Sequence, residues 1–188
     1  MGETRKLAAI LVSDVVGYSR LAGADEDRIL ARLRALRTDL IDPTIAVHHG
    51  RVVKRTGDGA IVEFRSVVDA VNCAIEIPRA MVESNARVAS DKRIEFRIGI
   101  HLGDVVEESD GDLMGDCVNI AARLQGVANP GGICISDDAF RQGSGPEFQQ
   151  PSLLPIMSEA SLYRPSGGLP SGVGNGVSIR RGGTGLVR

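Results

Sequence analysis

Residues 6–16 restrict the fold more than any other segment, because nearly every residue in them is apolar. An apolar run of this length is typical of a β-strand that is buried on both faces, whereas a half-exposed strand alternates apolar and polar residues. Such a strand has to lie inside a sheet that other elements cover on both sides. The segment therefore predicts a layered domain of helices and strands built around this strand.

A helix and a β-hairpin are predicted after this strand. The acidic residues at 25–27 favour the start of a helix. The apolar residues behind them repeat at helical spacing, which predicts an amphipathic helix; they are Ile29, Leu33, Leu36 and Leu40. Residues 51–56 and 60–64 predict two strands around the turn Gly57-Asp58-Gly59, because Asp-Gly is a strong hairpin signal.

The pattern then predicts two more helices and two more strands. Ser66 is expected to cap a second helix, in which Pro78 should produce a kink or an early end. Residues 94–102 alternate strictly between apolar and polar side chains, which predicts a half-buried strand. A third helix is expected at residues 116–125, capped by its first residue, and residues 133–135 predict a further short strand.

The predicted order, β-α-β-β-α-β, is that of the ferredoxin-like fold, an α+β class with an antiparallel sheet, here with an added helix and strand. Residues 143–188 differ from this part, because they hold ten of the 23 glycines and five of the eight prolines. We interpret residues 1–142 as one domain and residues 143–188 as a low-complexity tail rich in Gly, Pro, Ser and Arg, which we expect to be disordered.

Composition excludes several classes of protein. The chain has 188 residues, and its 22 basic and 24 acidic residues leave a net charge of −2, so no general attraction to nucleic acid is expected. No apolar segment approaches the roughly 18–20 residues that would predict membrane insertion. The three cysteines (Cys73, Cys117 and Cys134) are odd in number and far apart, which argues against a disulfide framework and a zinc site. These features predict a cytoplasmic protein with small buried cysteines.

Two acidic residues lie where metal chemistry would need them. Asp14 ends the first strand, and Asp58 occupies the hairpin turn. In a ferredoxin-like sheet the first strand is central and lies beside this hairpin, so the two carboxylates can face each other. Each residue also has a purely structural explanation, because Asp14 can cap the turn at Gly17 and Asp58 can serve only the turn itself. Together they favour a hard cation such as Mg²⁺.

Two further sequence features are weak evidence for a functional site when each is taken alone. Residues 15–19 join the first strand to a helix, and their backbone N–H groups, beside Gly17, can bind phosphate. Asn119 and Arg123 are four residues apart and so share one face of the third helix. A solvated polar stripe is the alternative interpretation of that pair.

Four segments, in this order and at this spacing, resemble the catalytic domain of class III nucleotidyl cyclases, the adenylate and guanylate cyclase family. They are residues 11–19 (LVSDVVGYS), 54–59 (KRTGDG), 98–103 (IGIHLG) and 115–123 (GDCVNIAAR). The resemblance extends from about residue 6 to residue 142. It implies the fold of that domain and a reaction on a nucleoside triphosphate.

The resemblance implies that Asp14, Asp58 and Val15 bind two divalent cations, either Mg²⁺ or Mn²⁺. In such a site the cations activate the ribose 3′-hydroxyl and neutralise the triphosphate. It also implies that Gly17 and Tyr18, in the turn after the first strand, contact the substrate.

Lys54 and Asp112 match the base-recognition pair of the resembled family. A lysine can donate to N1 of adenine, and a carboxylate can accept from the exocyclic amino group, whereas guanine presents the opposite pattern. Only three of the 22 basic residues are lysines, so a lysine at this position is informative. Asn119 and Arg123 match the pair that orients the ribose and stabilises charge at the α-phosphate.

The resemblance implies an adenylate cyclase that converts ATP to 3′,5′-cyclic AMP and pyrophosphate for intracellular signalling. Because the family divides each site between two subunits and this chain has all six residues, a homodimer is expected. The chain departs from the family in having no lysine after Lys92, where a triphosphate-binding lysine is usual. The alternative is therefore a catalytically impaired module that binds nucleotide or dimerises. A guanylate cyclase is disfavoured by Lys54 and Asp112.

Overall fold

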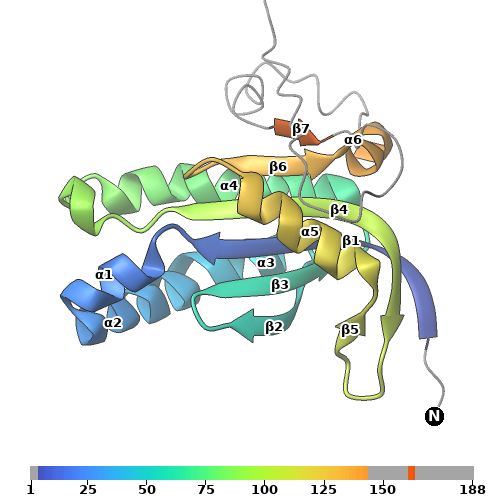
Figure 1. Ribbon diagram of the computed structural model, residues 1–188, viewed down its shortest axis with the longest axis horizontal. Helices are drawn as coiled ribbons and strands as arrows, with labels where there is room; N and C mark the ends of the chain where they lie inside the picture. The colour runs from blue at the N-terminus through green and yellow to red at the C-terminus, as the bar shows by residue number, and fades with distance from the viewer. Residues whose placement is uncertain (1–3, 144–160, 164–188) are drawn as a thin grey trace, which may run out of the picture.

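The computed structural model describes residues 4–143 and 161–163 (Figure 1). Most of the segment predicted to be a disordered tail lies outside these residues, so that prediction and the boundary at residue 142 stay predictions. The strands are β1 Thr4–Val15, β2 Arg51–Thr56, β3 Gly59–Phe64, β4 Phe96–Glu107, β5 Leu113–Met114, β6 Ile133–Ser136 and β7 Ser161–Tyr163.

Six α-helices and two shorter helical segments surround the sheet in the described part of the chain. The α-helices are α1 Tyr18–Ala24, α2 Glu26–Leu36, α3 Asp42–Val47, α4 Val67–Asn85, α5 Asp116–Val127 and α6 Asp137–Gly143. A π-helical segment, η1 Arg37–Ile41, joins α2 to α3, and a 3₁₀ turn, η2 Ser90–Lys92, precedes β4. Within the described ranges, no helix has both the length and the apolarity needed to cross a lipid bilayer.

The sheet has the order β2-β3-β1-β4-β6-β7, with β5 paired to β4 outside this path. β1 is central and pairs antiparallel with β3 on one side and with β4 on the other. β6 and β7 add to the sheet in parallel. The predicted α+β class with an antiparallel ferredoxin-like core is thus confirmed, and β7 adds a short edge strand from within the segment assigned to the tail.

Two apolar layers cover the two faces of the sheet. On one face, α2, α3 and α4 pack against alternate residues of β1, β3 and β4 and form the larger core. On the other face, α5 packs against β1 and β4 (Figure 1). Gly99 permits this second contact, because a Cβ atom there would lie 2.2 Å from the carbonyl oxygen of Ala121 in α5. Only a residue without a side chain lets the helix come so close.

Most predicted elements are present at the expected residues. β2 occupies the residues predicted for it, and the alternating segment forms the first half of β4. Ser66 caps α4, since its hydroxyl oxygen accepts hydrogen bonds from the N–H groups of Val68 and Asp69 at 3.2 and 3.4 Å. The three cysteines are buried, as predicted, and burial raises the pKa of the Cys73 thiol to about 12.

One helix prediction was wrong, and one of the two outcomes expected at Pro78 is excluded. α4 does not end early at Pro78 but continues to Asn85. Ile77 and Met81, on either side of the proline, are both buried in the core, and this packing compensates for the hydrogen bond that proline cannot make. Asp116 is the first residue of α5 rather than its cap, because Gly115 holds the cap position and no side chain satisfies the free N–H groups there.

Candidate active site

The hairpin between β2 and β3 brings Asp58 against Asp14. Gly59 follows Asp58, and a Cβ atom at Gly59 would lie 2.0 Å from the carbonyl oxygen of Ser13, so the hairpin packs directly on β1. The carboxyl groups of Asp14 and Asp58 are hydrogen-bonded to each other. Burial, followed by this hydrogen bond and the charge of Asp14, raises the pKa of Asp58 to about 6. The structure therefore brings the two acidic residues together.

The acidic pair fits a divalent cation. Two adjacent carboxyl groups offer hard oxygen donors, and a divalent cation between them would offset the repulsion of their charges. In the described ranges, no group of three or more His, Cys, Asp or Glu side chains is arranged to hold a metal. The remaining ligands would have to come from the backbone, from water or from a bound phosphate. Val15 can contribute only its backbone, because its side chain has no donor atom.

Two arginines that the sequence pattern did not single out contact this part of the site, one at Asp14 and one at the hairpin turn. Arg97 lies directly opposite Asp14 on β4, and its Nη2 donates to Oδ2 of Asp14 at 3.3 Å. Arg37, in η1, donates from Nη2 to the carbonyl oxygen of Gly57 and so holds the hairpin turn. The alternating pattern places Arg97 on one face of a strand, but only the register between β1 and β4 shows which acid it faces.

The turn after β1 leaves backbone N–H groups available. Gly17 has φ 62° and precedes α1, and its carbonyl accepts from the N–H groups of Arg20 and Leu21 at 3.0 and 3.1 Å. The first N–H groups of a helix have no partner within it, and this holds for those at Tyr18 and Ser19 in α1. The contacts of the Asp14 carboxyl are with Asp58 and Arg97 rather than with this turn. The structure therefore does not support the alternative in which Asp14 caps this turn.

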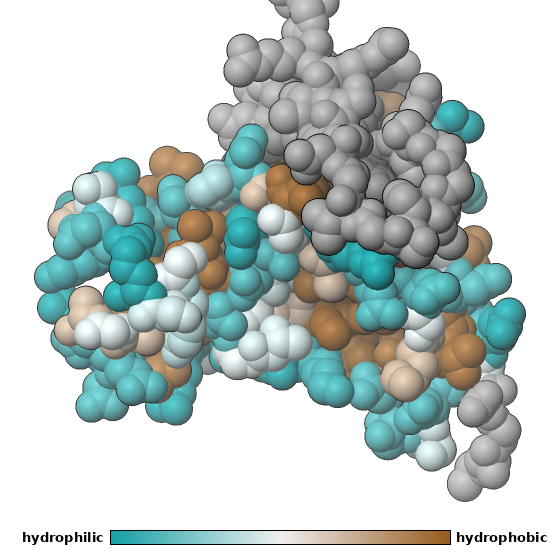
Figure 2. Space-filling view, viewed as in Figure 1, coloured by the Kyte–Doolittle hydropathy of each residue, from teal (hydrophilic) through white to brown (hydrophobic). Residues whose placement is uncertain are grey.

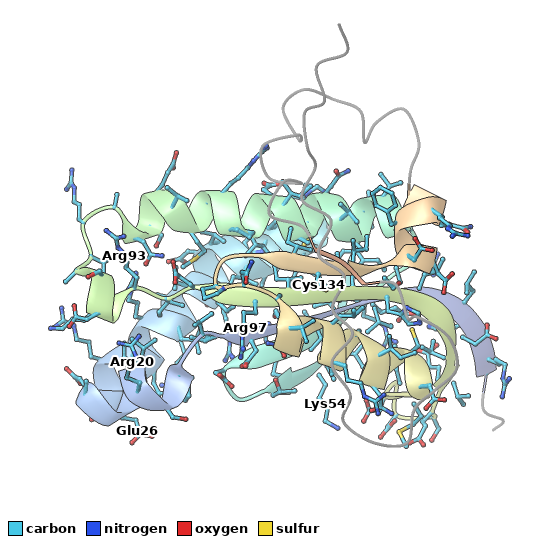
Figure 3. The ribbon with its side chains drawn as sticks, turned by 45° about the horizontal axis from the view of Figure 1, so that its top comes forward. Arg20, Glu26, Lys54, Arg93, Arg97 and Cys134 are labelled. Atoms are coloured by element: carbon cyan, nitrogen blue, oxygen red, sulfur yellow. The ribbon has the colours of Figure 1, made fainter. Side chains whose placement is uncertain are left out.

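Lys54 and Asp112 form an ion pair although 58 residues separate them, with Nζ and Oδ2 3.0 Å apart. Lys54 comes from β2, and Asp112 comes from the loop between β4 and β5. The hydrogen bond from Lys54, with one from the N–H of Leu113, lowers the pKa of Asp112 below its ordinary value. More than half of the Lys54 side chain is exposed, and Figure 3 shows it extending away from the ribbon, apart from Arg97. The structure thus brings together the two predicted base-recognition residues.

Asn119 and Arg123 lie on α5 with exposed side chains. Neither makes a side-chain hydrogen bond or ion pair within the described residues, so both groups are available to a ligand. No such contact joins them to Asp14 or Asp58 there either. The structure brings together the two acids, and separately the Lys54–Asp112 pair, but not all six residues.

Asp14, Lys54 and helix α5 lie on the same face of the sheet. Asp14 follows Ile10 and Val12 in the alternation of β1, and both of these pack in the core beneath α5. Val53 and Ile61, on β2 and β3, are only partly buried on the same face. Figure 2 shows apolar side chains at the surface of this side of the molecule. The helix therefore leaves part of an apolar face uncovered beside the charged groups.

Comparison with known proteins places these observations in a family. Residues 3–156 match the sequence model of the adenylate and guanylate cyclase catalytic domain. A putative adenylate cyclase 3 of Rhizobium meliloti is 49% identical over 133 residues, which are 71% of this chain and 22% of that relative. An adenylate cyclase of Streptomyces coelicolor is 34% identical over 135 residues, which are 71% of this chain and 33% of that relative. The chain thus spans a third or less of these two relatives.

A solved structure gives the same result. The crystal structure of an adenylate/guanylate cyclase/hydrolase from Silicibacter pomeroyi superposes with a TM-score of 0.70 at 44% sequence identity. The superposition covers 74% of this chain and 81% of the other.

Proposed function

This chain belongs to the family of adenylate and guanylate cyclase catalytic domains, and we propose that it converts ATP to 3′,5′-cyclic AMP and pyrophosphate. The observation that carries the choice of ATP is the Lys54–Asp112 pair, with its 3.0 Å contact. Lys54 can donate to N1 of adenine while Asp112 accepts from the amino group. Guanine has a donor at N1 and an acceptor at O6. Lys54 would then face a second donor, and Asp112 would face a second acceptor.

The acidic pair supports a metal-dependent reaction. Asp14 and Asp58 would hold two divalent cations, Mg²⁺ or Mn²⁺, with the backbone of Val15 beside them. When bound, such cations lower the pKa of the ribose 3′-hydroxyl and neutralise charge on the triphosphate. The N–H groups at Gly17 and Tyr18 would donate to phosphate oxygens at the start of α1.

Asn119 and Arg123 would act on the reacting part of the substrate. The amide of Asn119 can orient the ribose through hydrogen bonds, which fixes the 3′-hydroxyl relative to the α-phosphate. The guanidinium of Arg123 can donate two parallel hydrogen bonds to the oxygens on which charge develops. Both side chains are exposed and have no partner in the described part of the chain, as such roles require.

A homodimer would complete each site. Asn119 and Arg123 have no contact with the acidic pair, although both groups lie on the same partly uncovered face of the sheet. A second copy packed on this face would bury Val53 and Ile61 and would bring its own Asn119 toward the first copy's acids. Two equivalent sites would result.

Cyclic AMP production from ATP, measured with Mn²⁺ over a range of protein concentrations, tests the proposal. We expect turnover per chain to rise with concentration, because only the dimer has complete sites. Asp58→Ala should abolish turnover while leaving the circular dichroism spectrum unchanged. Production of cyclic GMP in preference to cyclic AMP would refute the assignment of ATP.

A second candidate rests on the sequence after Lys92, which contains no lysine for the triphosphate. Under this alternative the chain is an impaired cyclase that binds nucleotide or dimerises without turnover. The same assay separates the two, because binding of ATP without cyclic AMP at any protein concentration favours the impaired module.

A further inference from the structure

Four charged side chains form a connected cluster at the end of the sheet near β5. Lys6 Nζ lies 2.6 Å from a carboxylate oxygen of Glu63 and 2.6 Å from one of Glu107. Arg51 Nη2 lies 2.6 Å from Glu63 and 2.9 Å from Glu107, so each cation contacts both acids. We call Lys6, Arg51, Glu63 and Glu107 the sheet charge cluster.

The sheet charge cluster is anchored on a buried acid. Glu63 is 7% exposed and is the one charged side chain in the buried set of the described residues. Burial by itself would raise the pKa of Glu63, but hydrogen bonds from Lys6 and Arg51 outweigh it and hold that pKa below its ordinary value. A charged group that is fixed in this way holds its partners in one geometry.

Arg51 extends this cluster to the loop between β4 and β5. While Nε and Nη2 donate to Glu63, Nη1 donates to the carbonyl oxygen of Gly111 at 3.0 Å. Gly111 directly precedes Asp112, the acid that pairs with Lys54. Arg51 and Lys54 lie three positions apart on β2. They contact the successive loop residues Gly111 and Asp112.

The loop itself is closed by local hydrogen bonds. The N–H of Asp112 donates to Oδ1 of Asp110, and the N–H of Glu108 donates to the carbonyl of Asp112, both at 3.0 Å. These bonds fix the backbone of Asp112, and Oδ1 of its carboxylate accepts from the N–H of Leu113 at 2.9 Å. The loop as a unit is joined to β2 through Arg51 and through the exposed pair of Lys54 and Asp112, and only Arg51 is anchored on a buried acid.

We propose that Arg51 is a positioning residue for base selection: anchored on Glu63, it holds the carbonyl of Gly111 and so fixes the Asp112 carboxylate where adenine is read. This inference rests on the proposed function, since it assumes that Lys54 and Asp112 contact the base. Arg51 touches neither base nor phosphate in this scheme and acts only through the loop.

An arginine is needed at this position because three of its nitrogen atoms are used in different directions. Its planar fork donates to Glu63 and Glu107 on one side and to the Gly111 carbonyl on the other. A lysine keeps the charge, but its single ammonium group cannot reach all three acceptors in this geometry. Arg51→Lys should therefore remove the link to the loop while it still neutralises the charge of Glu63.

Competition binding with the full chain and Mn²⁺ tests the proposal. ATP and GTP displace a fluorescent ATP analogue, and the ratio of their affinities, taken from the initial displacement, measures base selection separately from the rate of turnover. We expect Arg51→Lys to lower this ratio about tenfold, as the loss of one well-placed hydrogen bond to the base would. Hydrogen exchange at the amides of residues 108–112 should accelerate in the same variant. Arg51→Met should lower the ratio at least as much.

Arg32→Met is the matched control. Arg32 also donates to a backbone carbonyl 60 residues away, that of Lys92, and to a side chain, that of Asn85, but it is remote from the loop that carries Asp112. The ratio of ATP to GTP affinity in Arg32→Met should stay within about twofold of that in the unmodified chain, because no group that contacts the base moves.

The proposal is overturned if Arg51→Lys leaves the ratio of ATP to GTP affinity unchanged. It is also overturned if hydrogen exchange at residues 108–112 is unchanged in that variant. An equal fall in Arg32→Met overturns it as well, because that result would mean that any loss of stability lowers the ratio. Failure of the proposed function is seen separately, in the unmodified chain, as an absence of cyclic AMP or a preference for GTP.

Discussion

Replacing Asp58 with asparagine should stabilise the metal-free protein. In the folded chain, burial and the hydrogen-bonded neighbour Asp14 raise the pKa of Asp58 from 3.8 to about 6. This difference corresponds to about 3 kcal/mol at a pH above both values. Because Asp58 is half-buried and solvent screens part of the repulsion, we expect about 1–1.5 kcal/mol to remain. An asparagine keeps the size and hydrogen bonding of the side chain but removes the second charge.

The sign of the pH dependence follows from the direction of this shift. Below about pH 4 the Asp58 carboxyl is protonated in the folded and the unfolded chain, and it has no effect on relative stability. Between about pH 4 and pH 6 the unfolded chain releases this proton while the folded chain retains it, so the stability of the unmodified protein falls as the pH rises. Above about pH 6 the penalty is constant. Asp58→Asn should therefore gain stability over the unmodified chain only as the pH rises through this range.

Thermal unfolding of the metal-free proteins at pH 4 and at pH 8 measures the effect. We expect Asp58→Asn to unfold about 2–6 °C above the unmodified chain at pH 8 and at the same temperature at pH 4. Adding Mn²⁺ at pH 8 should raise the melting temperature of the unmodified chain and not that of the variant. Asp39→Asn, at an exposed acid of η1, is the control and should show neither effect. A variant that is less stable than the unmodified chain at pH 8 without metal would refute the cost of burying this charge beside Asp14, on which the reasoning depends.

Three further predictions follow from the site and its scaffold. Gly99→Ala should lower the free energy of unfolding by about 2 kcal/mol or more, measured by urea denaturation, because its Cβ would collide with the backbone of α5. Mixing the inactive variants Asp58→Ala and Asn119→Ala should restore cyclic AMP production, because each mixed dimer has one undamaged site; subunit exchange without recovered activity would contradict the shared site. Replacing Lys54 with Glu and Asp112 with Ser should raise activity on GTP relative to ATP, and an unchanged preference would mean that these residues do not read the base.

The contact between the acidic residues could be predicted from the sequence, because it depends only on element order. Residues 6–16 are apolar on both faces, so they had to form an inner strand, and the Asp-Gly hairpin had to lie beside it. Asp14 and Asp58 then fall at neighbouring ends of neighbouring strands, where the structure has them. The contact between Lys54 and Asp112 was expected only from the family resemblance, because no local pattern relates residues so far apart.

Contacts that depend on register could not be predicted. Arg97, Arg37 and Arg51 all contact the candidate site or its supports, and each faces a partner that only the pairing of strands or a tertiary contact brings near. The π-helical segment was missed for a related reason. Leu40 continues the helical apolar repeat of α2, and a single repeat cannot show that one turn holds an extra residue.

The central position of β1 also has a consequence for how the chain is made. Its hairpin partner β3 ends at Phe64, but its other partner, β4, starts only at Phe96, and the ladder between them joins Thr4 to Glu107. During synthesis, one long edge of β1 thus stays open until more than a hundred residues have left the ribosome. Pairing over such a sequence separation is slow, and an open apolar edge can pair with another chain in the interval. Expression at reduced temperature should therefore increase the soluble yield of this chain.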